Sequence, residues 1–388
     1  MKVLILGGAG GMAYAAMKDL LEVDTEEISQ IVAADINQNK VEQVARGFGS
    51  GKLRPASIDI AEHAKLVEMM EGFDVVVNST VTAGSIPVAV LRAALEARVN
   101  MLDLGAWPEE TRQCLALDDA FKEAGLTAIL GFGSSPGTTN LMAKSLVDRL
   151  DTVETIELSF AYARVGTSTV PLKVPFLGAL TEFTAEPEVF REGSFIKLPP
   201  QSGLEDIQYP EPIGIRRSFL IGHPEIATFP ESFRDKGIKN VSMKAGFNPD
   251  FAEKVNFLIA LGIISEEAIK VGDTTVVPLD VLSACLAKLP PEEGEVKDYG
   301  CTRVIARGER AGESLEYTAL LFNRPQKELT GTQLRTGIPL SVGVRMLGRG
   351  EISRKGVFPP EIAIAPKPFF KEIAGRGLEI ALTSRTFL

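Results

Sequence analysis

The stretch KVLILGGAGGMA, residues 2–13, constrains the fold more than any other part of the sequence. An apolar run, residues 3–6, ends in glycines. Gly8, Gly10 and Ala13 then give the pattern G-x-G-x-x-A directly before a helical pattern. The first glycine allows a tight turn, the second lets a pyrophosphate approach the backbone, and the small third residue lets the helix pack close to the strand. The first N–H groups of such a helix favour phosphate. The residues predicted to contact a dinucleotide here are Gly8, Gly10, Gly11 and Met12.

The carboxylate of Asp35 predicts which dinucleotide is used. Asp35 ends the next apolar run, residues 31–35, at the spacing of about 20 residues at which dinucleotide-binding folds place an acid for the ribose. Such a carboxylate accepts a hydrogen bond from the ribose 2′-hydroxyl and repels a 2′-phosphate. We therefore expect NAD as the cofactor, with NADP less favoured.

Residues 1–135 alternate between short apolar runs and helical patterns. The expected strands are 3–6, 31–35, 53–58, 74–78, 99–104 and 127–131, with helices at 39–47, 61–72, 86–97 and 109–125. This alternation predicts an α/β fold, a doubly wound parallel sheet of the Rossmann type with ligands at the carboxyl ends of the strands. Asn78 and Thr80 follow the fourth strand and are further candidates for cofactor contact, although ordinary loop polarity explains them equally well.

Length, charge and cysteine content narrow the class of function. A chain of 388 residues suits about two domains. The net charge of −10 argues against nonspecific nucleic-acid binding, and no apolar run approaches the roughly 20 residues of a membrane span. The three cysteines form no C-x-x-C pair, so structural zinc and a disulfide framework are not expected. We predict a cytoplasmic protein without metal, nucleic-acid or membrane partners, because the chain also begins with a strand rather than a signal peptide.

The sixth expected strand leads into the glycine-rich turn GFGSSPGTTN, residues 131–140, and then into a helix. The start of this helix lies beside the expected nicotinamide position, where its N–H groups and polar side chains could hold a substrate carboxylate. We expect Gly137 to contact the cofactor, and Thr138 and Asn140 to contact the substrate. The alternative is a capped helix that only begins the next domain.

The chain changes character after about residue 150. Residues 154–164 alternate polar and apolar side chains, residues 303–307 and 315–322 form an expected hairpin, and residues 164–236 are rich in proline. We predict an α+β substrate, catalytic and dimerisation domain over residues 136–331. The Rossmann domain over residues 1–135 is then completed by about 332–365, where 336–339 opens an apolar helix that returns to the first domain.

Few side chains in the second domain suit proton transfer. His223 stands in a loop made rigid by proline, and a histidine titrates in the range that proton exchange with an amine or imine needs. Lys173 and Glu182 are charges inside apolar stretches, which predicts buried partners and a catalytic role beside His223. Glu225 and Arg216 are candidates for substrate ammonium and carboxylate, respectively. A structural loop histidine and solvated charges are the alternatives.

Six segments together resemble the saccharopine dehydrogenase family, closest to its lysine 6-dehydrogenase-like and saccharopine-reductase-like branch. They are GGAGGMA, GSSPGTTN, PLKVPFLGALTEFTAEPEVFREG (171–193), YPEPIG (209–214), GHPEIATFP (222–230) and TGIPLSVGVRMLGRGEISRKGVFPPE (336–361). The resemblance spans nearly the whole chain. It implies a Rossmann domain with an inserted α+β catalytic domain, a C-terminal helix that returns to the first domain, NAD(P)-dependent chemistry at a carbon–nitrogen bond, and a homodimer. Many members carry an acid before the Pro-Gly turn, where this chain has Ser135.

Three functions remain open at this point. The first is a lysine 6-dehydrogenase-like NAD-dependent oxidation of an amino acid's amine, which Asp35 favours over the NADP-using saccharopine reductases. The second is a saccharopine- or carboxynorspermidine-type reductase that joins an amine to an aldehyde through an imine. The third is a regulatory protein that binds NADH without turnover.

Overall fold

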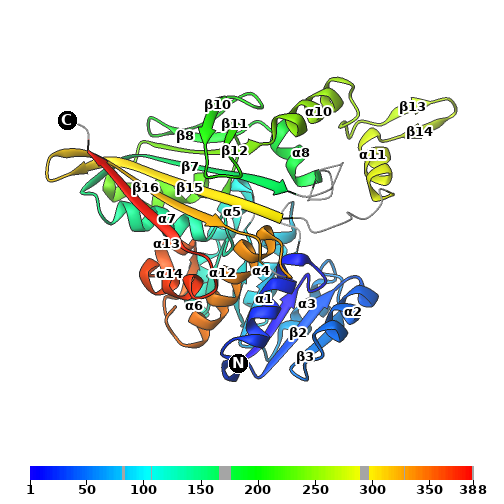
Figure 1. Ribbon diagram of the computed structural model, residues 1–388. Coiled ribbons are helices and arrows are strands. Elements are labelled where there is room, and N and C mark those ends of the chain that lie inside the picture. Colours follow the sequence, from blue (N-terminus) through cyan, green and yellow to red (C-terminus); the bar gives the residue numbers. More distant parts are fainter. Residues whose placement is uncertain (81–83, 106, 166–175, 289–296, 327, 387–388) are drawn as a thin grey trace.

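The computed structural model describes residues 1–80, 84–105, 107–165, 176–288, 297–326 and 328–386. Two β-sheets, one above the other in Figure 1, share a continuous hydrophobic core. Lys173 lies outside the described residues. Across the described ranges, every helix is too short or too polar to cross a membrane.

The first sheet has seven parallel strands in the order β17-β6-β5-β4-β1-β2-β3. They are β1 (Lys2–Leu6), β2 (Gln30–Asp35), β3 (Leu53–Ser57), β4 (Val75–Asn78), β5 (Asn100–Asp103), β6 (Thr127–Ile129) and β17 (Gly356–Phe358). Strands such as β4 are buried throughout because helices cover both faces of the sheet. The predicted doubly wound sheet is confirmed, and its strand order reverses between β1 and β4, where such sheets bind their ligand.

The helices of this unit follow the expected order, with one difference. They are α1 (Gly11–Glu22), α2 (Gln38–Phe48), α3 (His63–Met70), α4 (Ile86–Glu96), α5 (Pro108–Leu115) and α6 (Asp118–Glu123). The single helix expected over 109–125 is wrong, because the chain divides it into α5 and α6. The carboxylate of Asp118 at the start of α6 accepts from the backbone N–H of Val357 (2.9 Å), which ties this break to β17.

The second sheet is mixed and lies above the first. Its main path is β10-β11-β12-β7-β15-β16-β18, with β8 and β9 attached to β12, and only the β12–β7 pair is parallel. The strands are β7 (Thr152–Val165), β8 (Glu188–Arg191), β9 (Ser194–Lys197), β10 (Glu205–Gln208), β11 (Ile215–Leu220), β12 (Asn240–Phe247), β15 (Lys297–Arg310), β16 (Glu313–Asn323) and β18 (Ile380–Thr386). The helices associated with it are α7 (Thr138–Val147), α8 (Phe176–Thr184), α9 (Pro224–Ser232) and α10 (Pro249–Ala260). The predicted hairpin is β15–β16, and β18 was not anticipated.

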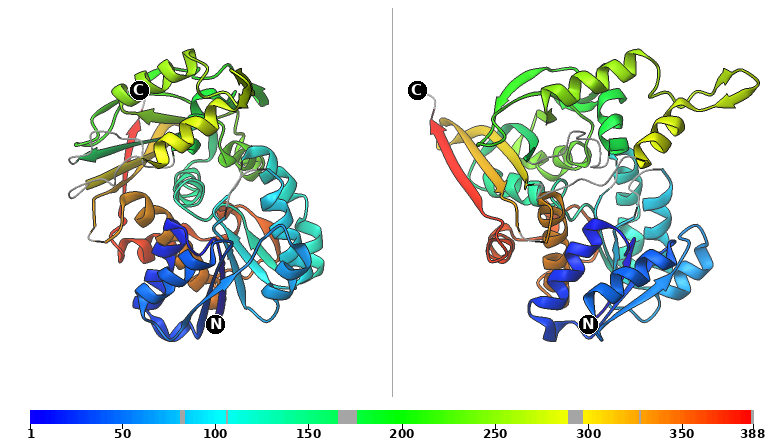
Figure 2. Two further views of the ribbon diagram at one scale, coloured as in Figure 1. Left: turned by 90° about the vertical axis from the view of Figure 1, so that its right-hand side faces the viewer. Right: turned by 45° about the vertical axis from the view of Figure 1, so that its right-hand side comes forward.

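A small hairpin extends away from the second sheet. It consists of β13 (Ile269–Val271) and β14 (Thr274–Val276), and helix α11 (Pro278–Ala287) follows it. Figure 2 shows this arm projecting from the molecule at the end opposite β18.

Helix α12 (Gly331–Gly348) joins the far end of the chain to the first unit. It begins at Gly331 rather than near Pro339, because Thr330 and Gln333 form a capping box and Pro339 lies inside the helix. A Cβ atom added to Gly337 would lie 2.5 Å from Cβ of Ala15, so α12 and α1 approach more closely there than a side chain allows. The chain continues through β17, α13 (Pro360–Ala363) and α14 (Pro366–Ala374) before it returns to the second sheet as β18.

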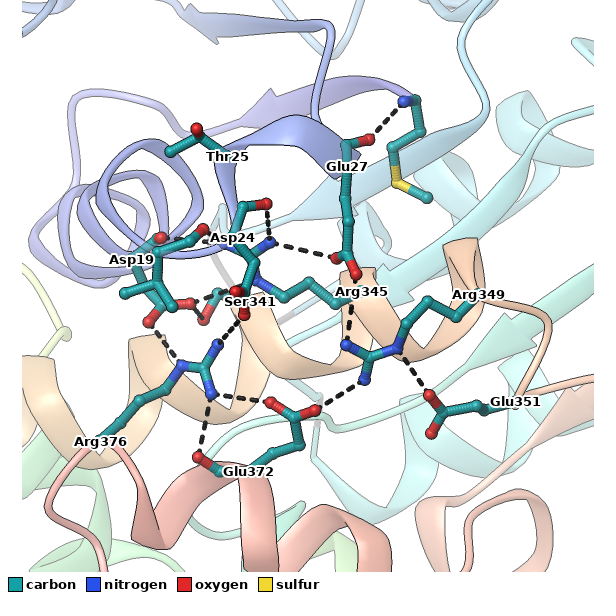
Figure 3. Close-up of polar contacts among 12 residues, drawn as sticks. Asp19, Asp24, Thr25, Glu27, Ser341, Arg345, Arg349, Glu351, Glu372 and Arg376 are labelled. Atoms are coloured by element: carbon teal, nitrogen blue, oxygen red, sulfur yellow. Dashed lines mark hydrogen bonds and ion pairs between the residues drawn. The ribbon is translucent and has the colours of Figure 1, made fainter.

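Buried arginines fasten α12 and the segment after α14 to the end of α1 (Figure 3). Arg345 is 0 % exposed and donates to the carbonyl oxygens of Asp19 (3.0 Å) and Asp24 (3.0 Å). Arg376 donates to the Asp19 carboxylate (2.6 Å) and to Glu372 (2.8 Å). Positive charge at the carboxyl end of a helix is favoured by the helix dipole, so these contacts hold the C-terminal segment against α1.

Candidate active site

The glycine turn after β1 leaves an anion site at the start of α1. Gly7 has a φ of +75°, so the left-handed position of the turn is Gly7 rather than Gly8. Gly8 is required for a different reason, because its Cβ would lie 2.7 Å from Cβ of Ala33. Gly10, the N-cap of α1, has no side chain to cap the helix, and the first turn carries no acid. The N–H groups of Gly8 and Gly10 donate to the carbonyl oxygens of Ala34 and Gly7, so the groups that fit a dinucleotide pyrophosphate are those of the first turn of α1, which starts at Gly11.

The other predicted cofactor residues lie around the same turn. The Asp35 carboxylate accepts from the backbone N–H groups of Ala9 (3.1 Å) and Asn37 (2.9 Å), which holds it beside the turn. Asn78 is buried and its side-chain oxygen accepts from the Thr80 hydroxyl (2.6 Å). The backbone of Ser79, between them, would contact a Cβ at Gly7.

The ends of β5 and β6 form a second wall of the site. Pro136 follows a cis peptide bond and fills a space left by two glycines, since a Cβ at Gly131 or Gly105 would lie 2.5 or 2.7 Å from its ring. The buried Asp103 carboxylate accepts from the N–H groups of Gly105 (2.9 Å) and Gly131 (2.6 Å). Burial raises the pKa of Asp103 to about 6, although these two hydrogen bonds oppose the shift. Asp103 was not among the predicted residues.

The structure gives the start of α7 an internal role. Thr138 donates to the Gly133 carbonyl through both its N–H (2.9 Å) and its hydroxyl (3.0 Å). The side-chain oxygen of Asn140 accepts from Gly137 N–H (2.8 Å), and its amide donates to the buried Glu361 (2.7 Å). The predicted contacts of Gly137, Thr138 and Asn140 with ligands are therefore not supported, because the loop carbonyls and Glu361 already use these groups.

A buried carboxylate, Glu225, lies at the centre of a polar cluster between the two sheets. The other members of this cluster are Ser135, Thr139 and His223. Glu225 is 0 % exposed and accepts from the hydroxyls of Ser135 (2.8 Å) and Thr139 (2.6 Å). Its other oxygen contacts Nδ1 of His223, the residue that precedes α9. The predicted pair His223 and Glu225 thus lies against the Pro-Gly turn, where β6 passes into α7.

The charges of this pair support each other. Burial alone would lower the pKa of His223, but the adjacent Glu225 carboxylate outweighs burial and raises it above its ordinary value. Burial alone would raise the pKa of Glu225, but His223 and the hydroxyls of Thr139 and Ser135 lower it. His223 therefore keeps its proton to higher pH than a free imidazole does, in contact with an ionised acid.

Glu182 is the second acid near His223. Helix α8 carries it onto the second sheet through Phe183, whose ring packs edge-on against Phe219 (4.9 Å between centroids). Burial raises the pKa of Glu182 to about 7, although the charge of His223 opposes the shift. Burial, opposed by Arg335, likewise raises the pKa of Tyr162 on β7 to about 12, and Glu182 adds to it. The charge of Glu182 therefore acts on both His223 and Tyr162.

One other predicted residue, Arg216, does not join this cluster. Arg216 lies on the opposite face of the second sheet from Tyr162, since its Cβ and that of Ala161 both approach Gly246. We therefore remove Arg216 from the site. His63, the other histidine of the sequence, is half exposed and contacts Glu96 (2.9 Å).

The chemistry available in the cluster is acid–base chemistry. The described part of the chain holds no group of three side chains suited to bind a metal ion.

Two residues of the site, Tyr162 and Glu361, were not predicted from the sequence. Tyr162 looks like one more apolar residue of an alternating strand, and Glu361 looks like part of a loop after prolines.

Comparisons with known proteins identify the family. Residues 3–129 match the saccharopine dehydrogenase NADP binding domain, and residues 133–378 match the saccharopine dehydrogenase C-terminal domain. The chain is 26% identical over 395 residues to carboxyaminopropylagmatine dehydrogenase of Synechocystis sp., covering 97% of this chain and 96% of that protein. It is 23% identical over 405 residues to carboxynorspermidine synthase of Vibrio cholerae, covering 96% and 94%. Its fold is similar to that of saccharopine dehydrogenase (L-Glu forming) from Saccharomyces cerevisiae, with a TM-score of 0.79, 16% identity and 99% of each chain covered.

Proposed function

The chain belongs to the saccharopine dehydrogenase family, and we propose that it reduces an imine formed between an aliphatic amine and an aldehyde that carries a carboxylate. It is an NAD(P)-dependent oxidoreductase, so the regulatory alternative loses its support. The names of the two relatives denote a polyamine or agmatine that bears a carboxyl group, which favours joining two substrates over oxidising one.

The observation that carries the proposal is the His223–Glu225 pair beside Glu182. Condensation of an amine with an aldehyde gives an imine and releases water, and the departing hydroxyl requires a proton. His223, which Glu225 keeps protonated, supplies that proton, and Glu182, which titrates near neutral pH, accepts one from the attacking ammonium. Glu225 stays ionised after His223 has given up its proton, so its negative charge helps to stabilise the positive charge of the imine.

The cofactor completes the balance of the reaction. When bound, the reduced nicotinamide supplies the hydride that converts the protonated imine to a secondary amine. The sum is amine, aldehyde, NAD(P)H and one proton giving secondary amine, NAD(P)⁺ and water. The residues that would hold the dinucleotide are Gly11 at the pyrophosphate and Asp35 at the ribose. Because Asp35 presents a carboxylate there, we propose that NAD is preferred over NADP.

The test measures oxidation of NADH and NADPH with aldehydes that bear or lack a carboxylate, combined with diamines and agmatine. We expect turnover only when amine and aldehyde are both present. Substitution His223→Gln should lower kcat by about 10²–10⁴-fold, the usual value of general acid–base catalysis. His63→Gln is the matched control, because His63 is half exposed and should have no effect. Turnover unaffected by His223→Gln would overturn the proposed role of this residue.

Oxidation of a single amino acid is the second candidate function. The carboxylate of Asp35 favours this function, because a carboxylate at the ribose suits NAD rather than NADP. The same protein incubated with NAD⁺ and lysine or other amino acids distinguishes the two. Formation of NADH from lysine alone, with no reaction of amine–aldehyde pairs, would replace the proposed function by this one.

The homodimer and the cytoplasmic location stay predictions, and light scattering of the 41.8 kDa chain tests the homodimer.

A further inference from the structure

Three residues from different strands form a row across the second sheet. In the register of β7, β15 and β16, Gly300 pairs with Tyr162 on one side and with Asn323 on the other. Directly paired residues of antiparallel strands point to the same face, so the row has a ring at one end, an amide at the other and no side chain between them. These strands lie next to one another above α12 in Figure 1.

The guanidinium of Arg335, from α12, occupies the gap in this row. Its Cζ lies 4.1 Å from the centroid of the Tyr162 ring, and Nη1 donates to the side-chain oxygen of Asn323 (3.3 Å). A Cβ at Gly300 would lie 2.3 Å from Nη1 of Arg335 and 2.5 Å from the Asn323 oxygen. The absence of a side chain at residue 300 is therefore what admits the guanidinium.

Arg335 is a buried charge that has no acidic partner among the described residues. The residue is 3 % exposed, and its guanidinium donates to neutral groups, Asn323 and the hydroxyl of Thr332 (2.8 Å). Within the described residues no carboxylate lies within 4.0 Å of it, and the nearby Asp298 instead accepts from the N–H of Thr332 (3.3 Å). Arg345 and Arg376, in contrast, both contact Asp19.

A cation in this position favours an anion from outside the chain. Burying an unpaired charge costs several kcal/mol, and a guanidinium has five donors in a planar fork that matches a carboxylate. The ring of Tyr162 beneath the guanidinium is only partly buried, and the charge of Glu182 acts on the Tyr162 hydroxyl. The charges of Glu182 and His223 act on each other, so Arg335 is linked electrostatically, through Tyr162 and Glu182, to His223.

We propose that Arg335, seated on Gly300 and Tyr162, binds the carboxylate of the aldehyde substrate. This rests on the proposed function and adds to it, because it makes a carboxylate on one partner the feature that the site selects. The carboxylate then lies on the side of the cluster away from the Pro-Gly turn, and the carbonyl carbon lies between Arg335 and His223.

The experiment compares succinic semialdehyde with butanal, two aldehydes of the same chain length that differ by a carboxylate, using the amine that gives turnover. For Arg335→Lys we expect the KM for succinic semialdehyde to rise about 10–100-fold, as for loss of a charge-assisted, bidentate pair, with kcat within about threefold. The KM for butanal should stay within about twofold. Arg324→Lys is the matched control, an exposed arginine that lies over the ring of Phe322.

A second variant, Gly300→Ala, keeps the charge and displaces the guanidinium, so it should raise the KM for succinic semialdehyde in the same selective way. Equal KM increases for both aldehydes, or an increase confined to the dinucleotide, would overturn the assignment. If the wild-type protein turns over no pair of substrates, the proposed function fails, and the carboxylate site is judged by calorimetric titration of succinate. Binding that Arg335→Lys abolishes would support the site, and no binding to the wild-type protein would overturn it.

Discussion

Removal of the Glu225 carboxylate gives the sharpest test of the polar cluster. Glu225 is fully buried and accepts from Ser135, Thr139 and His223. Glu225→Ala leaves two hydroxyls and a protonated imidazole without their acceptor. Because loss of one partner from a buried ion pair usually costs about 3–5 kcal/mol, we expect the free energy of unfolding to fall by that amount. Glu225→Gln keeps an oxygen for the two hydroxyls, so its loss should be about 1–3 kcal/mol.

The dependence of this loss on pH follows from the two pKa shifts. Glu225 has a lowered pKa when folded, so its contribution to stability is present above its unfolded pKa of about 4.3 and disappears as the pH falls through the folded value. His223 has a raised pKa, so its contribution is complete below about 6.5 and disappears as the pH rises through the folded value. The difference between wild type and Glu225→Gln should therefore be largest near pH 5–6 and smaller at pH 9.

Urea unfolding at several pH values measures this difference, and the pH profile of kcat/KM for imine reduction adds a second readout. Without Glu225, only the charge of Glu182 opposes the lowering of the His223 pKa by burial, so the alkaline limb of the profile should move to lower pH in Glu225→Gln. A loss of stability that is the same at pH 5.5 and pH 9, together with an unmoved alkaline limb, would refute the coupling of His223 to Glu225.

Three further predictions concern single residues. Burial raises the pKa of Glu182 to about 7, so its ionisation above that pH opposes folding, and Glu182→Gln should melt higher than wild type at pH 8.5 but not at pH 4.5, while kcat falls about 10²–10⁴-fold. Asp35→Asn should reduce the preference for NADH over NADPH by about tenfold in kcat/KM, and an unchanged ratio would contradict the role of this carboxylate. Gly337→Ala should lower the free energy of unfolding by about 1–3 kcal/mol, because the new methyl group meets Ala15, whereas alanine at an unobstructed helix position would raise it.

The order of the elements in the first unit could be predicted because each element has its own signal in the local sequence. Continuous apolar runs mark strands buried on both faces, and the glycine turn with Asp35 identifies the ligand end of the sheet. His223, Glu225 and Glu182 could be named for a similar reason, since their residue types are unusual in their local context. The structure joins His223 to Glu225, and the charge of Glu182 on α8 acts on His223.

Other parts of the site depend on information that a local pattern does not hold. Polar residues at the start of a helix have the same types whether they cap it or bind a ligand, so Thr138 and Asn140 could not be distinguished. The face on which Arg216 lies depends on the phase of its strand, and a shift by one residue reverses it. Arg335 reaches Tyr162 because Gly300 of β15 pairs with Tyr162 of β7 and leaves room for the guanidinium. The local sequence of β7 or of β15 does not reveal this pairing.

Helix α12 sets the relation between the glycine turn and the proposed carboxylate site at Arg335. Gln333 and Gly337 lie four residues apart and therefore share one face, which packs beside Gly11 and against Ala15 of α1. Arg335 comes two residues after Gln333, about 200° around the helix, so it points to the opposite side, toward the second sheet. The glycine turn and the guanidinium are thus separated by the width of one helix, about 10 Å, and this spacing does not depend on any loop. A substrate held at Arg335 would consequently meet the cofactor only when the distance between its carboxylate and its reacting carbon suits that spacing.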